Sequence, residues 1–337
     1  MVCVCQSYLS LLNSFVEGEK PSEVKYKRHE PLTPYLYLDV PGVIDDFYLN
    51  IIHWNTQHEL LVALTDVLYI WNSESGEANE IYKCSNDIEL NTYISSVLFM
   101  DDTTVIFGDV FGVLRVIDLT TQRLIMERQM HTDRINSLAK TCCTLATGSR
   151  DNTVQLFDTR CEDIVCSELV CHKGEVCGID FNGSGTYIGT GANDNSVILS
   201  DLRMIKPFLT YFHNAAVKAI KFDPTNEHII ATGGGSSDRT IKLMNINTNQ
   251  LITELKTHSQ VTGIVWCDDE LMVTHGYPFN TITFYDTQHW NKTGEFDGHD
   301  GRILSIAMNN HGIAATIGSD EMIRVWKVCN SNDSILK

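Results

Sequence analysis

The feature that most constrains this chain is a repeat of about forty residues. Five histidines recur at spacings of 41, 41, 45 and 41 residues: His131, His172, His213, His258 and His299. Each is followed by a short polar step and a strand-like apolar run, such as "RINSLA" or "RILSIA", and the first two by a Gly-x-x-Asp turn, "GSRD" or "GAND". Such a period indicates supersecondary units that cannot bury their hydrophobic faces alone and must stack on one another.

These blocks resemble WD40 repeats, each of which normally forms one four-stranded blade of a β-propeller. Two weaker copies precede them, over residues 47–71 and 93–118. The sum of seven predicts an all-β fold, a seven-bladed WD40 β-propeller over residues 35–328. The last repeat ends on its third strand near Trp326, so residues 35–40 are predicted to supply the fourth strand and close the ring. Residues 1–34 are expected to form a short, flexible N-terminal extension, and residues 329–337 a short polar tail.

The run "GGGSSD" over residues 233–238 raises a choice between two readings. A Gly-rich run can cradle a phosphate, but no helix follows this one to direct its N-terminal dipole at an anion. The run stands where the other repeats have their Gly-x-x-Asp turn, so the glycines are predicted to allow a tight turn. Asp238 is then equivalent to Asp151 and Asp194. In WD40 proteins this Asp binds the repeat histidine, so all five histidines are expected to fasten loops, not to catalyse or bind metal.

Composition excludes several classes of partner. The formal charge of -18 disfavours nucleic acid and anionic membranes and favours basic peptides. No apolar stretch approaches the ~18 residues of a membrane span, and the first residues lack the basic region of a secretory signal. Eleven cysteines include no paired CxxC motif, so neither a zinc site nor any other cofactor is expected, and the cysteine usage suits the reducing cytoplasm and nucleus.

The repeat also predicts which polar residues share one rim of the propeller. Partners of propellers are usually bound by loops and rims, and the His–Asp pairs should bring two kinds of loop together. One kind precedes each opening strand, and the other joins the two middle strands of a blade. The rim is predicted to carry Asp46, Arg134, Glu175, Ala216, Gln260 and Arg302 from the first kind, and Asn193, Asn195, Ser236, Arg239 and Glu321 from the second. Mixed charges and amides suit short polar peptides, and no nucleophile motif indicates an enzyme.

Residues 36–54, "LYLDVPGVIDDFYLNIIHW", are more specific than the repeats. They resemble the segment that opens the propeller of the Fizzy and Fizzy-related proteins, the coactivators of the anaphase-promoting complex, a ubiquitin ligase. Further segments agree with that family in order and spacing: "GANDNSV", "ATGGGSSDRTIKLMN", "THSQVTGIVW", "ELMVTHGYPFN" and "GHDGRILSIAM". The resemblance covers roughly residues 24–328.

The resemblance implies a protein that binds degrons, the short destruction signals of cell-cycle regulators such as cyclins and securin. Positions that match the family's pocket for the Lys-Glu-Asn box are Asp46, Asn193, Asn195, Ser236, Gln260 and Arg302. Ser236 stands where the family often has Thr, and it keeps the hydroxyl. Positions that match the family's groove for the destruction box are Leu38, Asp39, Pro41 and Glu321. Leu38 is equally compatible with a purely ring-closing core role. The implied partners are the anaphase-promoting complex, degron-bearing substrates and checkpoint proteins.

Some features depart from the family. The sequence has no Asp-Arg-Tyr/Phe-Ile-Pro-x-Arg C-box, with which members dock on the complex, and it ends in Ile335-Leu336-Lys337 where members typically end in Ile-Arg. Docking on the ligase therefore stays open. Three alternatives remain: a generic WD40 scaffold for another complex, a degron binder that does not activate the ligase, and an enzyme built on a propeller.

Overall fold

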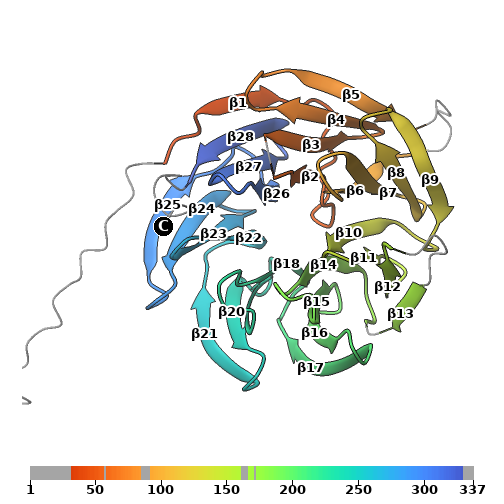
Figure 1. Cartoon of the computed structure of the whole chain (residues 1–337). Helices are drawn as coiled ribbons and strands as arrows, with labels where there is room; N and C mark the ends of the chain where they lie inside the picture. The colour runs from red at the N-terminus through yellow and green to blue at the C-terminus, as the bar shows by residue number, and fades with distance from the viewer. Residues whose placement is uncertain (1–31, 57, 85–91, 161–165, 171, 329–337) are drawn as a thin grey trace, which may run out of the picture. The chain divides into compact units, whose positions relative to one another are not determined.

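The computed structural model describes residues 32–56, 58–84, 92–160, 166–170 and 172–328. The predicted N-terminal extension, apart from residues 32–34, and the predicted tail lie outside these ranges. The described residues within Pro31–Lys337 belong to one compact unit. Within the described residues the chain forms strands β1–β28 and no α-helix, arranged as seven four-stranded sheets around a central channel (Figure 1).

The first four sheets, or blades, each use four strands that are consecutive in the sequence. Blade 1 consists of β2 (Ile52–Trp54), β3 (Glu59–Leu64), β4 (Val67–Asn72) and β5 (Ala78–Lys83). Blade 2 consists of β6 (Ile94–Phe99), β7 (Thr104–Asp109), β8 (Val113–Asp118) and β9 (Arg123–Gln129). Blade 3 consists of β10 (Ile135–Lys140), β11 (Thr144–Ser149), β12 (Thr153–Asp158) and β13 (Cys166–Val170). Blade 4 consists of β14 (Val176–Phe181), β15 (Tyr187–Ala192), β16 (Ser196–Asp201) and β17 (Lys206–Phe212).

Blades 5 and 6 also use consecutive strands, whereas blade 7 joins the two ends of the ring. Blade 5 consists of β18 (Val217–Phe222), β19 (Ile229–Gly234), β20 (Thr240–Asn245) and β21 (Gln250–Lys256). Blade 6 consists of β22 (Val261–Cys267), β23 (Glu270–His275), β24 (Thr281–Asp286) and β25 (Lys292–Asp297). Blade 7 consists of β26 (Ile303–Met308), β27 (Ile313–Gly318), β28 (Met322–Lys327) and the first strand of the chain, β1 (Leu36–Asp39).

Strand β1 completes blade 7 by pairing antiparallel with β28, from Leu36 opposite Val325 to Asp39 opposite Met322 (Figure 1). This pairing covers the edge of β28, which would otherwise present unpaired backbone groups. The prediction of an all-β, seven-bladed propeller is confirmed.

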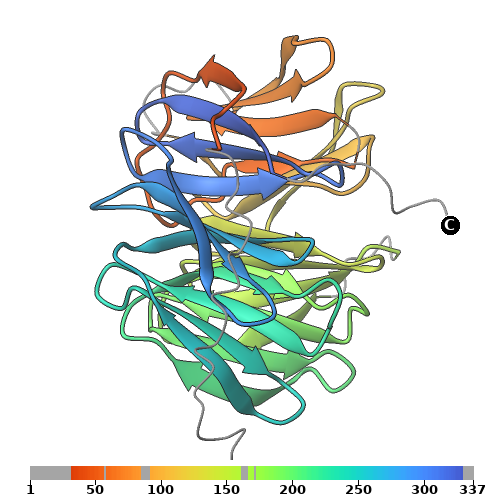
Figure 2. The ribbon, with the colours of Figure 1, turned by 90° about the vertical axis from the view of Figure 1, so that its left-hand side faces the viewer.

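The core lies between neighbouring blades, whose sheets face one another (Figure 2). The innermost strands β2, β6, β10, β14, β18, β22 and β26 contact one another in sequence around the whole channel. Burial falls from the channel outward: every residue of β6 is buried, whereas β9 at the outside of the same blade is largely exposed. The apolar runs of the inner strands therefore fill the blade interfaces, and the polar outer strands face water.

Four of the five repeat histidines fasten loops as predicted. Nδ1 of His131 lies 2.9 Å from Oδ2 of Asp151, and Nε2 lies 2.7 Å from the Thr147 hydroxyl. Burial disfavours the charged carboxylate of Asp151, but hydrogen bonds from His131 and Thr153 outweigh it and hold the pKa of Asp151 below its usual range. The other three pairs repeat this arrangement: His172–Asp194, His213–Asp238 and His299–Asp320.

The prediction is wrong for His258. This histidine is exposed, and its ring packs edge-on against Phe279 at a centroid distance of 6.5 Å. Phe279 occupies the turn position at which the other four repeats have Asp, so no carboxylate is available for a His–Asp pair in blade 6.

The role predicted for the glycine run is also wrong in its physical reason. Gly233 and Gly234 lie inside β19, and neither has a positive φ; the left-handed residue of this turn is Arg239, with φ 54°. A Cβ on Gly233 would lie 2.2 Å from Cγ1 of Val261 in the next blade. A Cβ on Gly234 would lie 2.0 Å from the Asp238 carboxylate. These glycines are required by close approach, not by turn geometry.

Candidate functional site

The loops that precede the inner strands gather at one end of the channel, which we call the loop face. It is defined by Arg134, Glu175, Gln260 and Arg302, each of which directly precedes the inner strand of its blade, and by Asp46, which lies six residues before β2 and not directly before it as predicted. The inner strands run in the same direction and lie side by side, so their starting loops meet although they are far apart in the sequence.

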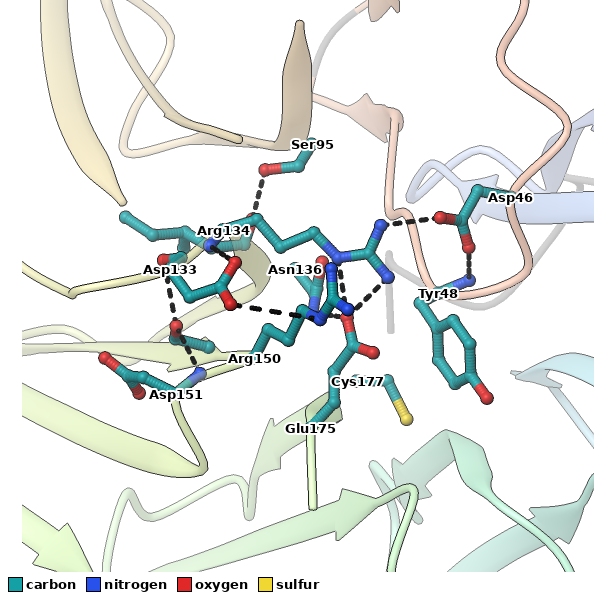
Figure 3. A network of polar contacts seen from close by, with 12 residues as sticks. Asp46, Tyr48, Ser95, Asp133, Arg134, Asn136, Arg150, Asp151, Glu175 and Cys177 are labelled. Atoms are coloured by element: carbon teal, nitrogen blue, oxygen red, sulfur yellow. Dashed lines mark hydrogen bonds and ion pairs between the residues drawn. The ribbon is translucent and has the colours of Figure 1, made fainter. Parts of the chain in front are cut away.

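Arg134 is the centre of a buried polar network on the loop face. Figure 3 shows its guanidinium between two carboxylates from other blades. Its Nε donates to Oε1 of Glu175 at 2.6 Å, and its Nη1 donates to Oδ2 of Asp46 at 2.6 Å. The side chains of Arg134 and Glu175 are 7% and 8% exposed. The network thus braces blades 1, 3 and 4 across the channel.

Electrostatics keeps this arginine charged. Burial disfavours its charged form, but hydrogen bonds with Tyr93 and Asp46 and the charges of Glu175 and Asp46 outweigh burial and raise the pKa of Arg134. Its guanidinium also lies 5.8 Å from the centre of the Tyr48 ring, a distance suited to a cation–π contact. Arg134 is therefore committed to the protein's own structure.

Asp46 is held in place by the same network. Its second oxygen, Oδ1, accepts the backbone N–H of Tyr48 at 2.9 Å, and its side chain remains 27% exposed. A carboxylate fixed by two partners and still open to water has lone pairs left for an incoming cation.

Arg302 lies on the same face in a more open setting. Its Nη2 donates to the backbone oxygen of Asp45 at 2.6 Å, and its Nε forms an ion pair with the Asp45 carboxylate. The Arg302 side chain is 19% exposed and that of Asp45 is 50% exposed. Gln260 is its neighbour: a Cβ on Gly276 would lie 2.9 Å from Oε1 of Gln260 and 3.5 Å from Cβ of Arg302.

The remaining residues predicted for the Lys-Glu-Asn box lie on the turns between the middle strands of blades 4 and 5. Asn193 donates its backbone N–H to the backbone oxygen of Glu175 at 2.8 Å, which places it beside the Arg134 network. Asn195 follows with φ 67°, a conformation that Asn tolerates better than most residues. The backbone oxygen of Ser236 accepts a hydrogen bond from Nε of Arg239 at 2.8 Å, and Nη1 of Arg239 donates to the backbone oxygen of His258, close to Gln260.

Of the six residues predicted for the Lys-Glu-Asn box, the structure connects four on the loop face: Asp46, Asn193, Gln260 and Arg302. Contacts link Asn193 through Glu175 and Arg134 to Asp46, and the neighbouring Asp45 pairs with Arg302. Asn195 and Ser236 lie on the turns between the middle strands of blades 4 and 5. The role of all six residues in binding stays a prediction.

The four residues predicted for the destruction box lie together at the junction of blades 7 and 1. Leu38 pairs with Ile323 and packs half-buried against the core, while Asp39 and Pro41 are exposed. Glu321 is exposed at the β27–β28 turn, and its Oε1 accepts the N–H of Gly42 at 3.2 Å. Its backbone oxygen accepts the N–H of Val40 at 2.9 Å. Two carboxylates thus flank the end of β1.

Sequence reasoning missed two residues. Asp45 was not predicted because only its neighbour Asp46 was assigned to the site, although the pair "DD" indicates two adjacent carboxylates. Lys218 is 5% exposed in β18 and donates to the backbone oxygens of Leu49 at 2.7 Å and Leu304 at 2.5 Å. Burial without a carboxylate partner lowers the pKa of Lys218 to about 7. A lysine inside the apolar run "AVKAIKF" is the signal that would have found it.

Two other kinds of site receive no support from the described residues. Within them, no group of three or more His, Cys, Asp or Glu side chains is placed to hold a metal ion. The same part of the chain contains no helix that is long and apolar enough to span a membrane.

Seven blades, four of them fastened by His–Asp pairs, define the molecule as a WD40-repeat propeller with a charged and amide-rich loop face. A family model described as the CDC20/Fizzy WD40 domain matches residues 38–326. The chain therefore belongs to the CDC20/Fizzy family of WD40 proteins.

Individual relatives agree with this assignment. The chain is 33% identical over 324 residues to Protein FIZZY-RELATED 1 of Arabidopsis thaliana, covering 95% of this chain and 67% of that protein. It is 30% identical over 299 residues to APC/C activator protein CDH1 of Saccharomyces cerevisiae, covering 88% of this chain and 52% of that protein. A chain in a crystal structure of the Mitotic Checkpoint Complex superimposes with a TM-score of 0.84 at 32% identity, covering 88% of this chain and 95% of that one.

Proposed function

We propose that this protein is a substrate-recognition coactivator of the anaphase-promoting complex that binds Lys-Glu-Asn-box and destruction-box degrons on its propeller. The observation that carries the proposal is the gathering of Asp46, Asn193, Gln260 and Arg302 on one loop face in a member of the CDC20/Fizzy family. The activator named among its relatives supports the link to the ligase.

The chemistry of the loop face suits the three residues of the Lys-Glu-Asn box. Arg302 offers a guanidinium to the degron Glu, and charge-assisted pairs of this kind are the stronger hydrogen bonds of proteins. Asp46 offers a carboxylate to the degron Lys. The amides of Asn193, Asn195 and Gln260 and the hydroxyl of Ser236 supply both donors and acceptors for the degron Asn.

Binding at this face is an exchange of partners. In the free protein Arg302 is paired with Asp45, and Asp46 is paired with Arg134. The degron Glu must displace the exposed Asp45 from Arg302, whereas the degron Lys approaches an Asp46 that keeps Arg134. The more exposed pair is the cheaper one to open, because exposed ion pairs contribute little stability.

The destruction box is assigned to the junction of blades 7 and 1. Asp39 and Glu321 provide carboxylates for the Arg of that degron, and Leu38 and Pro41 provide apolar contacts near its Leu. Neither site performs chemistry: the protein raises the local concentration of substrate beside the ligase by combining several modest contacts. Checkpoint proteins are further proposed partners, and cytoplasm and nucleus are the proposed locations.

A peptide-binding assay on the purified protein tests the proposal. Fluorescent Lys-Glu-Asn-box and destruction-box peptides are expected to bind, and scrambled peptides of the same composition are expected not to. Equal binding of scrambled peptides would leave only the generic WD40 scaffold. If degrons bind, capture of the anaphase-promoting complex with the native protein and a ubiquitination assay separate an activator from a binder that does not activate.

A further inference from the structure

The turn that joins β10 to β11 carries two adjacent cysteines. The N–H of Thr141 donates to the oxygen of Thr144 at 2.8 Å, which closes the turn around Cys142 and Cys143. The two Sγ atoms lie 3.4 Å apart. Cys142 is exposed and Cys143 is partly exposed, so solutes reach the pair directly.

This environment differs from that of the other described cysteines. Cys84, Cys177 and Cys267 are buried, and burial raises the pKa of Cys84 to about 11 and raises that of Cys177 further. At the turn, the hydrogen bond from Cys143 lowers the pKa of the Cys142 thiol and raises that of Cys143. The thiolate is the reactive form of cysteine, so reactivity is directed to Cys142, with a second thiol in contact.

We propose that Cys142 and Cys143 form a reversible redox-modification site, a vicinal dithiol that a peroxide converts to a disulfide within the turn. The Cys142 thiolate attacks one oxygen of hydrogen peroxide, the O–O bond breaks, and the departing hydroxide takes up a proton to leave as water. The resulting sulfenic acid is attacked by the Cys143 sulfur. The S–S bond forms, the S–O bond breaks, and the thiol proton leaves with the hydroxyl group as a second water.

Geometry makes such a bond easy to reverse. Adjacent Cα atoms are ~3.8 Å apart, below the ~4.4 Å at which ordinary disulfides begin, and strained disulfides are more readily reduced. The site also lies away from the loop face, because the turn follows the end of inner strand β10 whereas the loop face is where inner strands begin. Oxidation is therefore expected to leave degron binding unchanged.

Peptide mapping of the native protein tests the site. The protein is treated with hydrogen peroxide, alkylated, and digested with trypsin. Cleavage after Lys140 and Arg150 releases residues 141–150, which contain Cys142 and Cys143 and no other cysteine. The expected result is a peptide that has lost two hydrogen atoms, resists alkylation, and regains both thiols with dithiothreitol. The peptide over residues 174–203, with buried Cys177, is the matched internal control and is expected to keep its thiol.

Single substitutions separate a dithiol from two independent thiols. In Cys143→Ser the intermediate cannot close, so a sulfenic acid on Cys142 is expected to accumulate and be trapped by dimedone. In Cys142→Ser, loss of the remaining thiol is expected to be slower. The proposal is overturned if peptide 141–150 of the wild type stays fully alkylated, if it carries sulfinic acids in place of the disulfide, or if its cysteines link to another part of the chain or to a second molecule.

Discussion

Arg134 and Arg302 occupy equivalent places in the repeat, each directly before the inner strand of its blade, yet their surroundings differ. Arg134 is bonded to two carboxylates and a tyrosine hydroxyl and is 7% exposed. Arg302 has a single carboxylate partner, the half-exposed Asp45. The next blade supplies Glu175 to Arg134, whereas Arg302 pairs with Asp45, whose neighbour Asp46 binds Arg134. At equivalent repeat positions, Arg134 therefore serves as a structural brace that holds blades 1, 3 and 4 together, whereas the charge of Arg302 is available to bind a ligand.

The largest expected effect breaks the brace. Arg134→Met leaves Glu175 buried without its main counter-ion, and breaking a buried ion pair in this way costs about 3–5 kcal/mol of unfolding free energy. Arg302→Met, the matched control, is expected to cost under ~1 kcal/mol because its partner is exposed. Urea denaturation of both variants measures the difference, and equal losses would contradict the distinction between brace and available charge.

The second prediction concerns degron affinity. Arg302→Ala removes a charged hydrogen-bond donor, so the Lys-Glu-Asn-box peptide is expected to lose about 1.5–3 kcal/mol of binding free energy, roughly tenfold to a hundredfold in Kd. The destruction-box peptide, assigned to Asp39 and Glu321, is the control and should bind unchanged. A parallel loss for both peptides in fluorescence anisotropy would undo the separation into two sites.

The third prediction concerns the pH dependence of stability that arises from Lys218, a buried amine that pairs with backbone oxygens and with no carboxylate among the described residues. Lys218 has its pKa lowered from 10.5 to about 7 by burial. Between these values the folded protein holds Lys218 neutral while the unfolded chain is protonated, so unfolding takes up a proton and stability rises with pH. Below pH 7 the cost of the buried charge is fully present.

The slope that this lysine contributes is at most about 1.4 kcal/mol per pH unit. Denaturation midpoints between pH 7 and 8 should therefore rise more steeply for the wild type than for Lys218→Met. Identical slopes in the two proteins would show that Lys218 titrates in the same range folded and unfolded.

The smallest expected effect tests whether Asp45 competes with the degron Glu for Arg302. Asp45→Asn removes the carboxylate that competes with the degron Glu, and we expect the Lys-Glu-Asn-box peptide to bind more tightly by under ~1 kcal/mol, the usual worth of an exposed ion pair. Asp46→Asn should weaken the same peptide. If Asp45→Asn weakens binding as much as Arg302→Ala does, Asp45 positions the arginine and does not compete for it.

The repeat predicted most of the fold because its hydrophobic and turn residues recur at one period. Positions of Asp151, Asp194 and Asp238 identified the loops that the histidines fasten. The prediction from the repeat was wrong for His258, because Phe279 stands where the other repeats have Asp. A pattern averaged over the repeats does not show a substitution in one of them. The prediction also failed for Gly233, whose reason is the proximity of Val261 in the next blade, a contact that one blade's sequence does not contain.

For the loop face, the sequence predicted that these positions are close together but not which side chains pair with one another. Equivalent repeat positions predicted Asp46, Asn193 and Arg302 on one face, because residues one repeat apart lie at the same end of neighbouring blades. Which acid pairs with which arginine depends on side-chain reach across the channel, so Asp45 and the double engagement of Arg134 were visible only in three dimensions. Lys218 was missed because a strand pattern counts residues as inward or outward and does not show the backbone oxygens that Leu49 and Leu304 present to it.

A double-mutant cycle between Arg302 and the degron Glu tests the assignment of the loop face most directly. Wild type and Arg302→Gln are each titrated with a Lys-Glu-Asn-box peptide and with the same peptide carrying Gln in place of Glu. A direct ion pair predicts a coupling free energy of at least ~0.5 kcal/mol, so that the Glu-to-Gln change weakens binding to the wild type and barely affects Arg302→Gln. Additive losses, with no coupling, would show that Arg302 does not contact the degron Glu and would contradict the proposed site.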